Sequence, residues 1–124
     1  MKILLVDDDE FLRDMYALKF KSCGYDVTVA DGSTKALTLL DRGIEYDLLI
    51  VDMIMPGTTG VELLDIINQK FPKQIKHCIF LSNQGQDEDI REATEAGAVG
   101  YIIKASSIPS EVVAKVEEII KKQK

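Results

Sequence analysis

The chain has 124 residues, 46% of them hydrophobic, and a formal net charge of −6, which suits a single domain over residues 1–124 with a buried core. Its apolar runs fall far short of the ~20 residues that span a bilayer, its N-terminus lacks a signal-peptide pattern, and no lysine or arginine stripe offers a surface for nucleic acid. We therefore expect a cytoplasmic protein that contacts neither membrane nor nucleic acid directly.

Five short β-rich segments alternate with helical patterns along the whole chain. The strands are predicted at Lys2–Val6, Asp26–Ala30, Asp47–Val51, His77–Leu81 and Gly100–Ile103. The first, third and fourth are continuously apolar, as strands are in a parallel sheet that is covered on both faces.

The segments between the strands carry apolar residues at helical spacing. Phe11, Met15 and Leu18 predict the first helix. The last helix is predicted by a second row of apolar residues: Val112, Val113, Val116, Ile119 and Ile120. Three helical patterns are each followed by a glycine that can take the left-handed conformation beyond a helix end: Gly24, Gly43 and Gly97.

This alternation predicts an α/β fold with a doubly wound, five-stranded parallel sheet between two helical layers, because crossovers between parallel strands are right-handed. For five strands we favour the flavodoxin-like order 2-1-3-4-5, which makes a three-layer sandwich. In that order, ligands bind outside the carboxyl ends of the first and third strands.

Acidic side chains stand at those strand ends. Asp7, Asp8 and Asp9 follow the first strand, and Asp52 follows the third. Carboxylates that are brought together repel one another unless a cation or a proton intervenes. We therefore expect a hard divalent ion, and Mg²⁺ is the natural choice because it binds oxygen ligands and phosphate together.

A hydroxyl and an amine complete the same edge, since Ser82 follows the fourth strand and Lys104 follows the fifth. Lys104 supplies positive charge, and Ser82 supplies a hydrogen-bond donor. Phosphoryl transfer requires such groups around the equatorial oxygens, and a carboxylate can be the nucleophile. The sequence therefore predicts a phosphoryl site.

Four blocks of the sequence resemble the signature motifs of the response-regulator receiver family, and the resemblance covers the full chain. They are Leu5-Val6-Asp7-Asp8-Asp9, Val51-Asp52-Met53-Ile54-Met55-Pro56-Gly57, Leu81-Ser82 and Tyr101-Ile102-Ile103-Lys104. The resemblance implies that the chain is a signalling receiver in a two-component phosphorelay, and not an enzyme acting on other molecules.

The resemblance also implies a role for each residue of the site. Asp52 would accept the phosphoryl group, Ser82 and Lys104 would hold its oxygens, and Ser82 with Tyr101 would form the switch. The metal ligands would be Asp8, Asp52 and the carbonyl of Ile54, with Asp7 acting through water. For Tyr101, ordinary core packing is the alternative.

The implied partners are a sensor histidine kinase or phosphotransfer protein upstream, and a downstream protein or an output domain outside this sequence. We expect a monomer or a weak, phosphorylation-dependent dimer. Slow self-dephosphorylation is expected, because Ile54 and Gln84 lie two positions beyond Asp52 and Ser82, and neither is a general base.

The chain departs from the family pattern directly after Lys104, where the family usually has a proline in a cis peptide and this chain has Ala105. A cis bond to alanine costs roughly 3–4 kcal/mol, so the sequence does not favour it.

Several nearby residues have plainer explanations. We expect Asp9 to cap the first helix, Met53 and Met55 to pack their loop, and His77 to be structural. The segment from Gly57 to Gly60 is interpreted as a flexible turn.

The two cysteines stand singly in apolar surroundings, so we expect reduced core thiols with no disulfide and no zinc site at Cys23 or Cys78.

Other functions compete with the receiver. A haloacid-dehalogenase-like phosphatase has its nucleophile after the first strand and an acidic pair after its lysine, which this chain lacks. A flavodoxin-like module needs hydroxyls and glycines where this chain has Asp7-Asp8-Asp9. A pseudo-receiver acting only in protein interaction is the third alternative, and the complete site argues against it.

Overall fold

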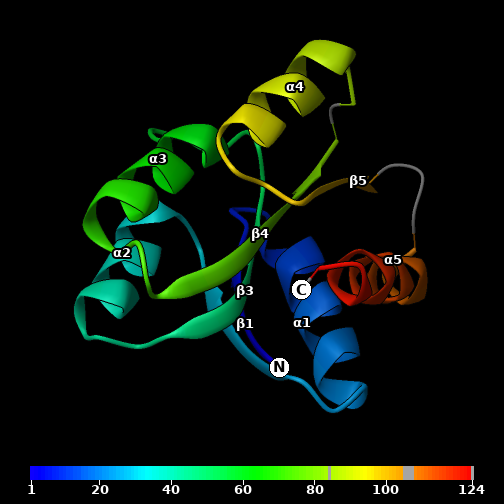
Figure 1. Cartoon of the computed structure of the whole chain (residues 1–124). Coiled ribbons are helices and arrows are strands. Elements are labelled where there is room, and N and C mark those ends of the chain that lie inside the picture. Colours follow the sequence, from blue (N-terminus) through cyan, green and yellow to red (C-terminus); the bar gives the residue numbers. More distant parts are fainter. Residues whose placement is uncertain (84, 105–107, 124) are drawn as a thin grey trace.

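The computed structural model describes residues 1–83, 85–104 and 108–123, and within these ranges five strands alternate with five helices (Figure 1). The strands are β1 (Lys2–Val6), β2 (Asp26–Ala30), β3 (Tyr46–Val51), β4 (Ile75–Ser82) and β5 (Gly100–Ile103). The helices are α1 (Glu10–Ser22), α2 (Ser33–Asp41), α3 (Gly60–Lys70), α4 (Asp87–Glu95) and α5 (Pro109–Lys121).

The five strands form one parallel sheet in the order β2-β1-β3-β4-β5, which confirms the predicted topology. Val6 at the end of β1 lies opposite Ala30 and Val51, and Ser82 lies opposite Ile103. The strands therefore end side by side. We call this end of the sheet the carboxyl edge, and the opposite end the amino edge.

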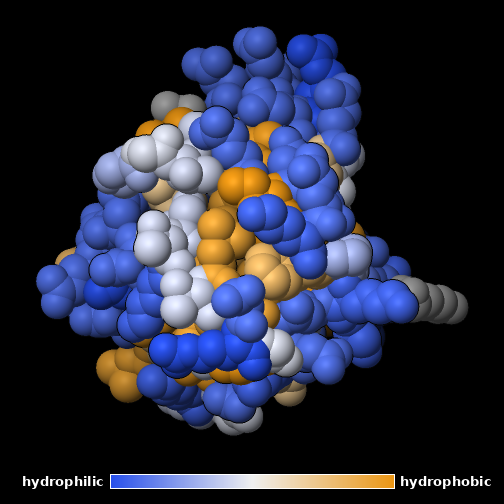
Figure 2. Space-filling view, turned by 90° about the vertical axis from the view of Figure 1, so that its left-hand side faces the viewer, coloured by the Kyte–Doolittle hydropathy of each residue, from blue (hydrophilic) through white to orange (hydrophobic). Residues whose placement is uncertain are grey.

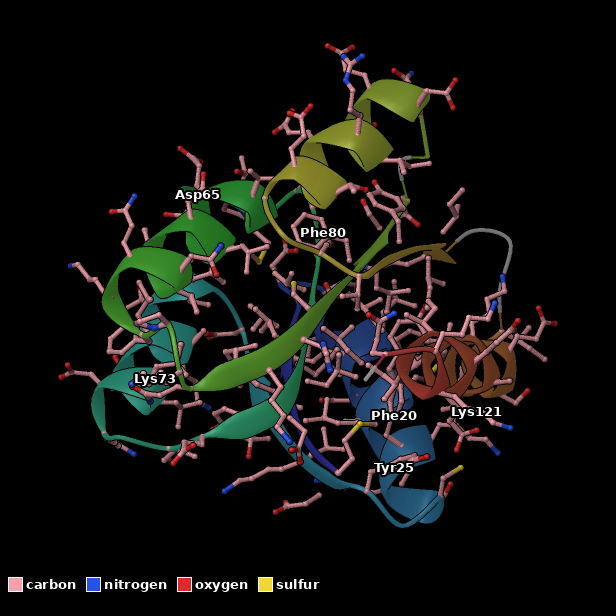
Figure 3. The ribbon with its side chains drawn as sticks, viewed as in Figure 1. Phe20, Tyr25, Asp65, Lys73, Phe80 and Lys121 are labelled. Carbon is pink, nitrogen blue, oxygen red and sulfur yellow. The ribbon has the colours of Figure 1, made fainter. Side chains whose placement is uncertain are left out.

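Helices cover both faces of the sheet, with α1 and α5 on one side and α2, α3 and α4 on the other (Figure 1). Successive strand residues alternate between the two cores, so that Leu4 packs with the α2–α4 side and Leu5 with the α1–α5 side. Figure 3 shows Phe80 and Phe20 in these two cores on opposite sides of the sheet. Burial on both faces explains why these strands are continuously apolar.

The predicted helix ends are confirmed. Gly24, Gly43 and Gly97 follow the last residues of α1, α2 and α4, and each has a positive φ. Pro109 begins α5, where its missing N–H leaves no hydrogen bond unmade.

The predicted first helix is confirmed as α1, but the apolar row that indicated it does not form the buried face. Phe11 and Leu18 are each 71% exposed, whereas Tyr16, Ala17 and Phe20 are buried against the sheet and α5. Both rows have helical spacing, and the two aromatic side chains bury more apolar area than Phe11 and Leu18 would. The apolar row chosen from the sequence therefore lies on the outer face.

Three smaller details also differ from the prediction. Cys23 is exposed just beyond α1, while Cys78 is buried in β4, and burial raises the pKa of the Cys78 thiol. Both cysteines are free thiols. Strand β4 extends from Ile75 to Ser82 because Ile75 pairs with Tyr46, and β3 begins one residue early, at Tyr46.

The outer face of α2 and α3 carries an apolar hollow, which Figure 2 shows as an orange strip between paler and blue side chains. It is lined by Thr34, Leu37, Thr38, Asp41, Ile66, Lys70 and Phe71. None of the predicted site residues lines it. Within the described ranges, no helix has the length and apolar character to span a membrane.

Candidate functional site

The loop after β1 turns one carboxylate inward and leaves the next in solvent. Asp7 is 1% exposed, and its carboxylate accepts a hydrogen bond from the Asp9 amide at 3.0 Å. Asp8 is exposed. Asp9 caps α1 by accepting from the Leu12 amide at 3.1 Å, which confirms its predicted capping role.

The loop after β3 holds Asp52 beside this cluster. The Asp52 amide donates to the Val6 carbonyl at 3.1 Å, so its main chain continues the pairing of β1 with β3. Its Oδ1 accepts a hydrogen bond from the Ile54 amide at 3.2 Å. The Asp52 side chain remains 12% exposed, so one side of the carboxylate is accessible to a small molecule.

Lys104 lies between the carboxylates of Asp7 and Asp52. Its Nζ is 2.6 Å from Asp7 Oδ2 and donates to Asp52 Oδ2 at 2.9 Å, and the lysine side chain is only 3% exposed. Burial by itself lowers the pKa of Lys104, but the two carboxylates outweigh burial and raise it. Lys104 is therefore held as a cation at neutral pH.

Burial has the opposite consequence for Asp7. It raises the pKa of this carboxyl group, and Lys104 and the Asp9 amide offset the rise only in part. A further positive charge at this position would stabilise the ionised form of Asp7.

The three carboxylates of Asp7, Asp8 and Asp52 fit a divalent cation. One oxygen from each lies within 4.8 Å of the others. The three groups range from buried to exposed, which leaves room on one side for the waters that Mg²⁺ keeps. Two of the residues that would hold such an ion, Asp7 and Asp52, also contact the Lys104 ammonium group.

Ser82 on β4 lies next to Asp52, and Tyr101 on β5 contacts Ser82 in turn. Ser82 is 1% exposed and lines a hollow with Asp52, Ile54 and Asn83. Tyr101 packs against Phe80 with ring centroids 6.3 Å apart. Burial raises the pKa of Tyr101, and a hydrogen bond from the Ser82 side chain opposes the rise. The Tyr101 ring is half-buried.

The segment after Asp52 ends in a capping box that was not predicted from the sequence. Thr59 and Glu62 form a capping box in which the Glu62 amide donates to Thr59 Oγ1 and the Thr59 amide donates to Glu62 Oε1. The Thr-x-x-Glu spacing was a readable signal. The segment expected to be a flexible turn is thus fixed at its end, and Met53 and Met55 pack it as predicted, at 4% and 5% exposure.

Arg13 also supports the site, and this role was not predicted from the sequence. Its guanidinium donates to the main-chain carbonyl of Asp7 at 3.1 Å, which links α1 to the loop that carries the acids. No motif in the sequence signals this contact. Two expectations concern residues outside the described ranges: the role of Gln84 in dephosphorylation and the conformation of the Lys104–Ala105 bond.

Comparison with known families identifies the chain's relatives. The family model described as the response regulator receiver domain matches residues 3–117. The chain belongs to this family. The resemblance noted in the sequence is therefore confirmed along almost the whole chain.

Two curated proteins illustrate the relationship. The chemotaxis protein CheY of Pseudomonas aeruginosa is 35% identical over 107 residues, which cover 84% of each chain. The transcriptional regulatory protein ResD of Bacillus subtilis is 32% identical over 123 residues, covering 98% of this chain and 48% of ResD. The chain thus spans about half the length of such transcriptional regulators.

Solved structures agree on the fold. The receiver domain of Francisella response regulator 1452 has a TM-score of 0.84 and 30% identity, covering 99% of this chain and 98% of that one. Vibrio cholerae CheY4 has a TM-score of 0.86 at 24% identity, covering 95% and 97%, and this likeness concerns the fold alone.

Proposed function

We propose that residues 1–124 form a single phosphoryl-accepting domain, and that Asp52 takes a phosphoryl group from a sensor histidine kinase or a phosphotransfer protein. The observation that carries the proposal is the placement of the Asp52 carboxylate. It lies within 4.8 Å of the Asp7 and Asp8 carboxylates and 2.9 Å from the Lys104 ammonium group. Family membership makes a two-component pathway in the cytoplasm the natural setting.

In the transfer step, an Asp52 carboxylate oxygen attacks phosphorus, an O–P bond forms, and the N–P bond of the donor phosphohistidine breaks. The electron pair of that bond stays on the histidine ring. Asp52 is reachable because it lines the hollow with Ile54, Ser82 and Asn83. The product is an aspartyl phosphate on the signalling domain itself.

Asp7, Asp8, Asp52 and the carbonyl of Ile54 would hold Mg²⁺, which neutralises negative charge on the acids and the transferred group. Lys104 already contacts Asp52 and can turn to a phosphoryl oxygen with little movement. Ser82 supplies a hydroxyl donor from the buried end of β4.

Phosphorylation adds acceptor oxygens beside Ser82, and Ser82 already contacts Tyr101. If Ser82 turns toward the phosphoryl group, Tyr101 loses that hydrogen bond and its ring repacks between β5 and α4. The face made by α4, β5 and α5 then presents a changed surface to a downstream protein or output domain. Because α4 is mostly polar, we propose weak, phosphorylation-dependent association there.

Intact-mass analysis with a small phosphodonor tests the proposal. We expect one phosphoryl group per chain when Mg²⁺ is present, none in chelator, and none on Asp52→Asn. Equal labelling of Asp52→Asn would remove Asp52 as the nucleophile. A wild-type chain that stays unlabelled with Mg²⁺ would favour a pseudo-receiver that acts only through protein contacts.

A further inference from the structure

Helix α3 begins directly against the main chain of Asp52. Gly60 is its first residue, and the Gly60 amide donates to the Met53 carbonyl at 2.9 Å. The capping box of Thr59 and Glu62 fixes the same point of the chain. The loop that carries Asp52 therefore closes onto the start of α3.

Gly60 allows this approach because it has no side chain. A Cβ atom at Gly60 would lie 2.3 Å from the Asp52 carbonyl oxygen, 3.1 Å from the Asp52 carbonyl carbon and 3.1 Å from Met53 Cα. All three are main-chain atoms, so no side-chain rotation can relieve the contact. The peptide between Asp52 and Met53 would have to move, or α3 would.

Moving α3 is the harder adjustment. Leu63, Leu64 and Ile67 on its inner face are at most 3% exposed and pack in the core. Interiors are close-packed, so a shift of the helix disturbs many contacts. The loop after β3 is anchored by the buried side chains of Met53 and Met55. A displacement of its Asp52–Met53 peptide would move the Asp52 carboxylate relative to Lys104 and Asp7.

Gly57, in the same loop, is a glycine for a different reason. It has φ +83°, a conformation that other residues adopt only with strain, but a Cβ at Gly57 would meet nothing within 4 Å. Gly60 has no positive φ, so its requirement is close approach alone. The two glycines thus separate backbone strain from contact with Asp52.

We propose that Gly60 is a positioning residue for the aspartyl site: by letting α3 begin against the Asp52–Met53 peptide, it sets where the Asp52 carboxylate stands. This inference rests on the proposed function, because the benefit is to metal binding and phosphoryl acceptance. Functional groups must be held within about 0.5 Å of their working position. Moving the Asp52 carbonyl oxygen from 2.3 Å to the 3.0 Å that a Cβ atom needs requires a shift of at least 0.7 Å, which exceeds that tolerance.

The experiment compares Gly60→Ala with Gly57→Ala. Calorimetric titration gives the Mg²⁺ dissociation constant of each folded variant, and thermal unfolding gives its stability. We expect both substitutions to lower the melting temperature. Only Gly60→Ala should also weaken Mg²⁺ binding, by about tenfold, as changes to groups that orient metal ligands do. It should slow labelling by a small phosphodonor as well.

Equal Mg²⁺ dissociation constants for Gly60→Ala and the wild type would overturn the inference, as would equal weakening in Gly57→Ala. The proposed function would survive either result, since it fails only if the wild-type chain accepts no phosphoryl group in the presence of Mg²⁺ or if Asp52→Asn is labelled equally.

The wild-type protein offers a second measurement should Gly60→Ala not fold. Its Gly60 amide should exchange slowly with solvent and shift on adding Mg²⁺, because it is bonded to Met53 next to Asp52. The Gly57 amide should respond less. A Gly60 amide that exchanges freely and ignores Mg²⁺ would contradict the positioning role.

Discussion

The two edges of the sheet differ in how deeply their polar groups are buried. Among the described residues, the buried polar or charged ones are Asp7, Ser82 and Lys104, and all three lie at the carboxyl edge. At the amino edge, Asp47 is half-buried and accepts a hydrogen bond from the Lys2 amide at 2.7 Å.

Burying charge costs free energy unless partners compensate for lost hydration. The amino edge avoids that cost by leaving its ionic groups partly in water. The carboxyl edge accepts it, with Lys104 clamped between Asp7 and Asp52. A fold alone does not require this arrangement, so the contrast points to the carboxyl edge as the place where buried charge serves chemistry.

Removing the buried cation at the carboxyl edge should have the largest effect on stability. Lys104→Met leaves the Asp7 carboxylate buried without its partner, and we expect a loss of about 3 kcal/mol in unfolding free energy. Lys2→Met, which loses only the contact with the Tyr46 ring, should cost at most about 1 kcal/mol.

Urea titration at neutral pH in chelator measures both. Mg²⁺ should restore part of the stability of Lys104→Met, because it supplies positive charge between the same acids. Equal losses of unfolding free energy in Lys104→Met and Lys2→Met would show that the buried contacts of Lys104 stabilise the fold no more than the contact of Lys2 does.

The lifetime of the phosphoryl group tests the hollow beside Asp52. Ile54 is 52% exposed in its lining and offers no group that orients water. We expect a slow loss of phosphate that becomes several-fold faster in Ile54→Asn, with decay followed by intact mass. Leu18→Asn, which makes the same kind of change at an apolar residue of α1 that is 71% exposed, should leave the lifetime unchanged. A lifetime that lengthens in Ile54→Asn would refute the interpretation.

The structural change on phosphorylation should reach the α4–β5–α5 face and leave the amino edge of the sheet almost unaffected. On adding beryllofluoride, a phosphoryl mimic, we expect amide chemical-shift changes at Arg91, Tyr101 and Val112, because the contact between Ser82 and Tyr101 links Asp52 to that face. The amino-edge amides of Lys2 and His77 should stay nearly still. Shifts confined to the loops around Asp8, Asp52 and Lys104 would contradict the proposed route.

The smallest effect concerns a tyrosine far from the site. Tyr25 donates to Glu117 of α5, and this hydrogen bond raises the pKa of Tyr25 to about 12. The folded state therefore keeps the phenol proton longer than the unfolded state, and the stabilisation, complete below pH 10, is lost as the pH rises toward 12. Tyr25→Phe should lose less stability than the wild type over that interval, measured by denaturant titration.

Much of the fold was predictable because strands and helix ends depend on local signals, and strand order follows general rules for parallel sheets. Continuous apolar runs identified β1, β3 and β4, and Gly24 and Gly97 marked helix ends. The grouping of Asp7, Asp52, Ser82 and Lys104 followed from topology, since parallel strands end at one edge.

What could not be predicted depends on contacts between distant segments. The inner face of α1 is decided by the match of Tyr16 and Phe20 to α5 and the sheet, and the sequence offered Phe11 and Leu18 at equal spacing. The close approach of Gly60 to Asp52 needs coordinates, because its φ is unremarkable and only the neighbouring peptide reveals the constraint.

Gln74 carries a consequence for engineering. Its side-chain amide donates to the carbonyls of Leu40 at 2.7 Å and Ile44 at 3.0 Å, and its own carbonyl accepts from the Tyr46 amide. One residue thus joins the connections before β3 and β4. Tolerance of an insertion depends on which main-chain bonds it breaks. A peptide tag or reporter inserted next to Gln74 would disrupt the hydrogen bonds that hold the connections before β3 and β4. The short turn before β4 is therefore a poor site for an insertion.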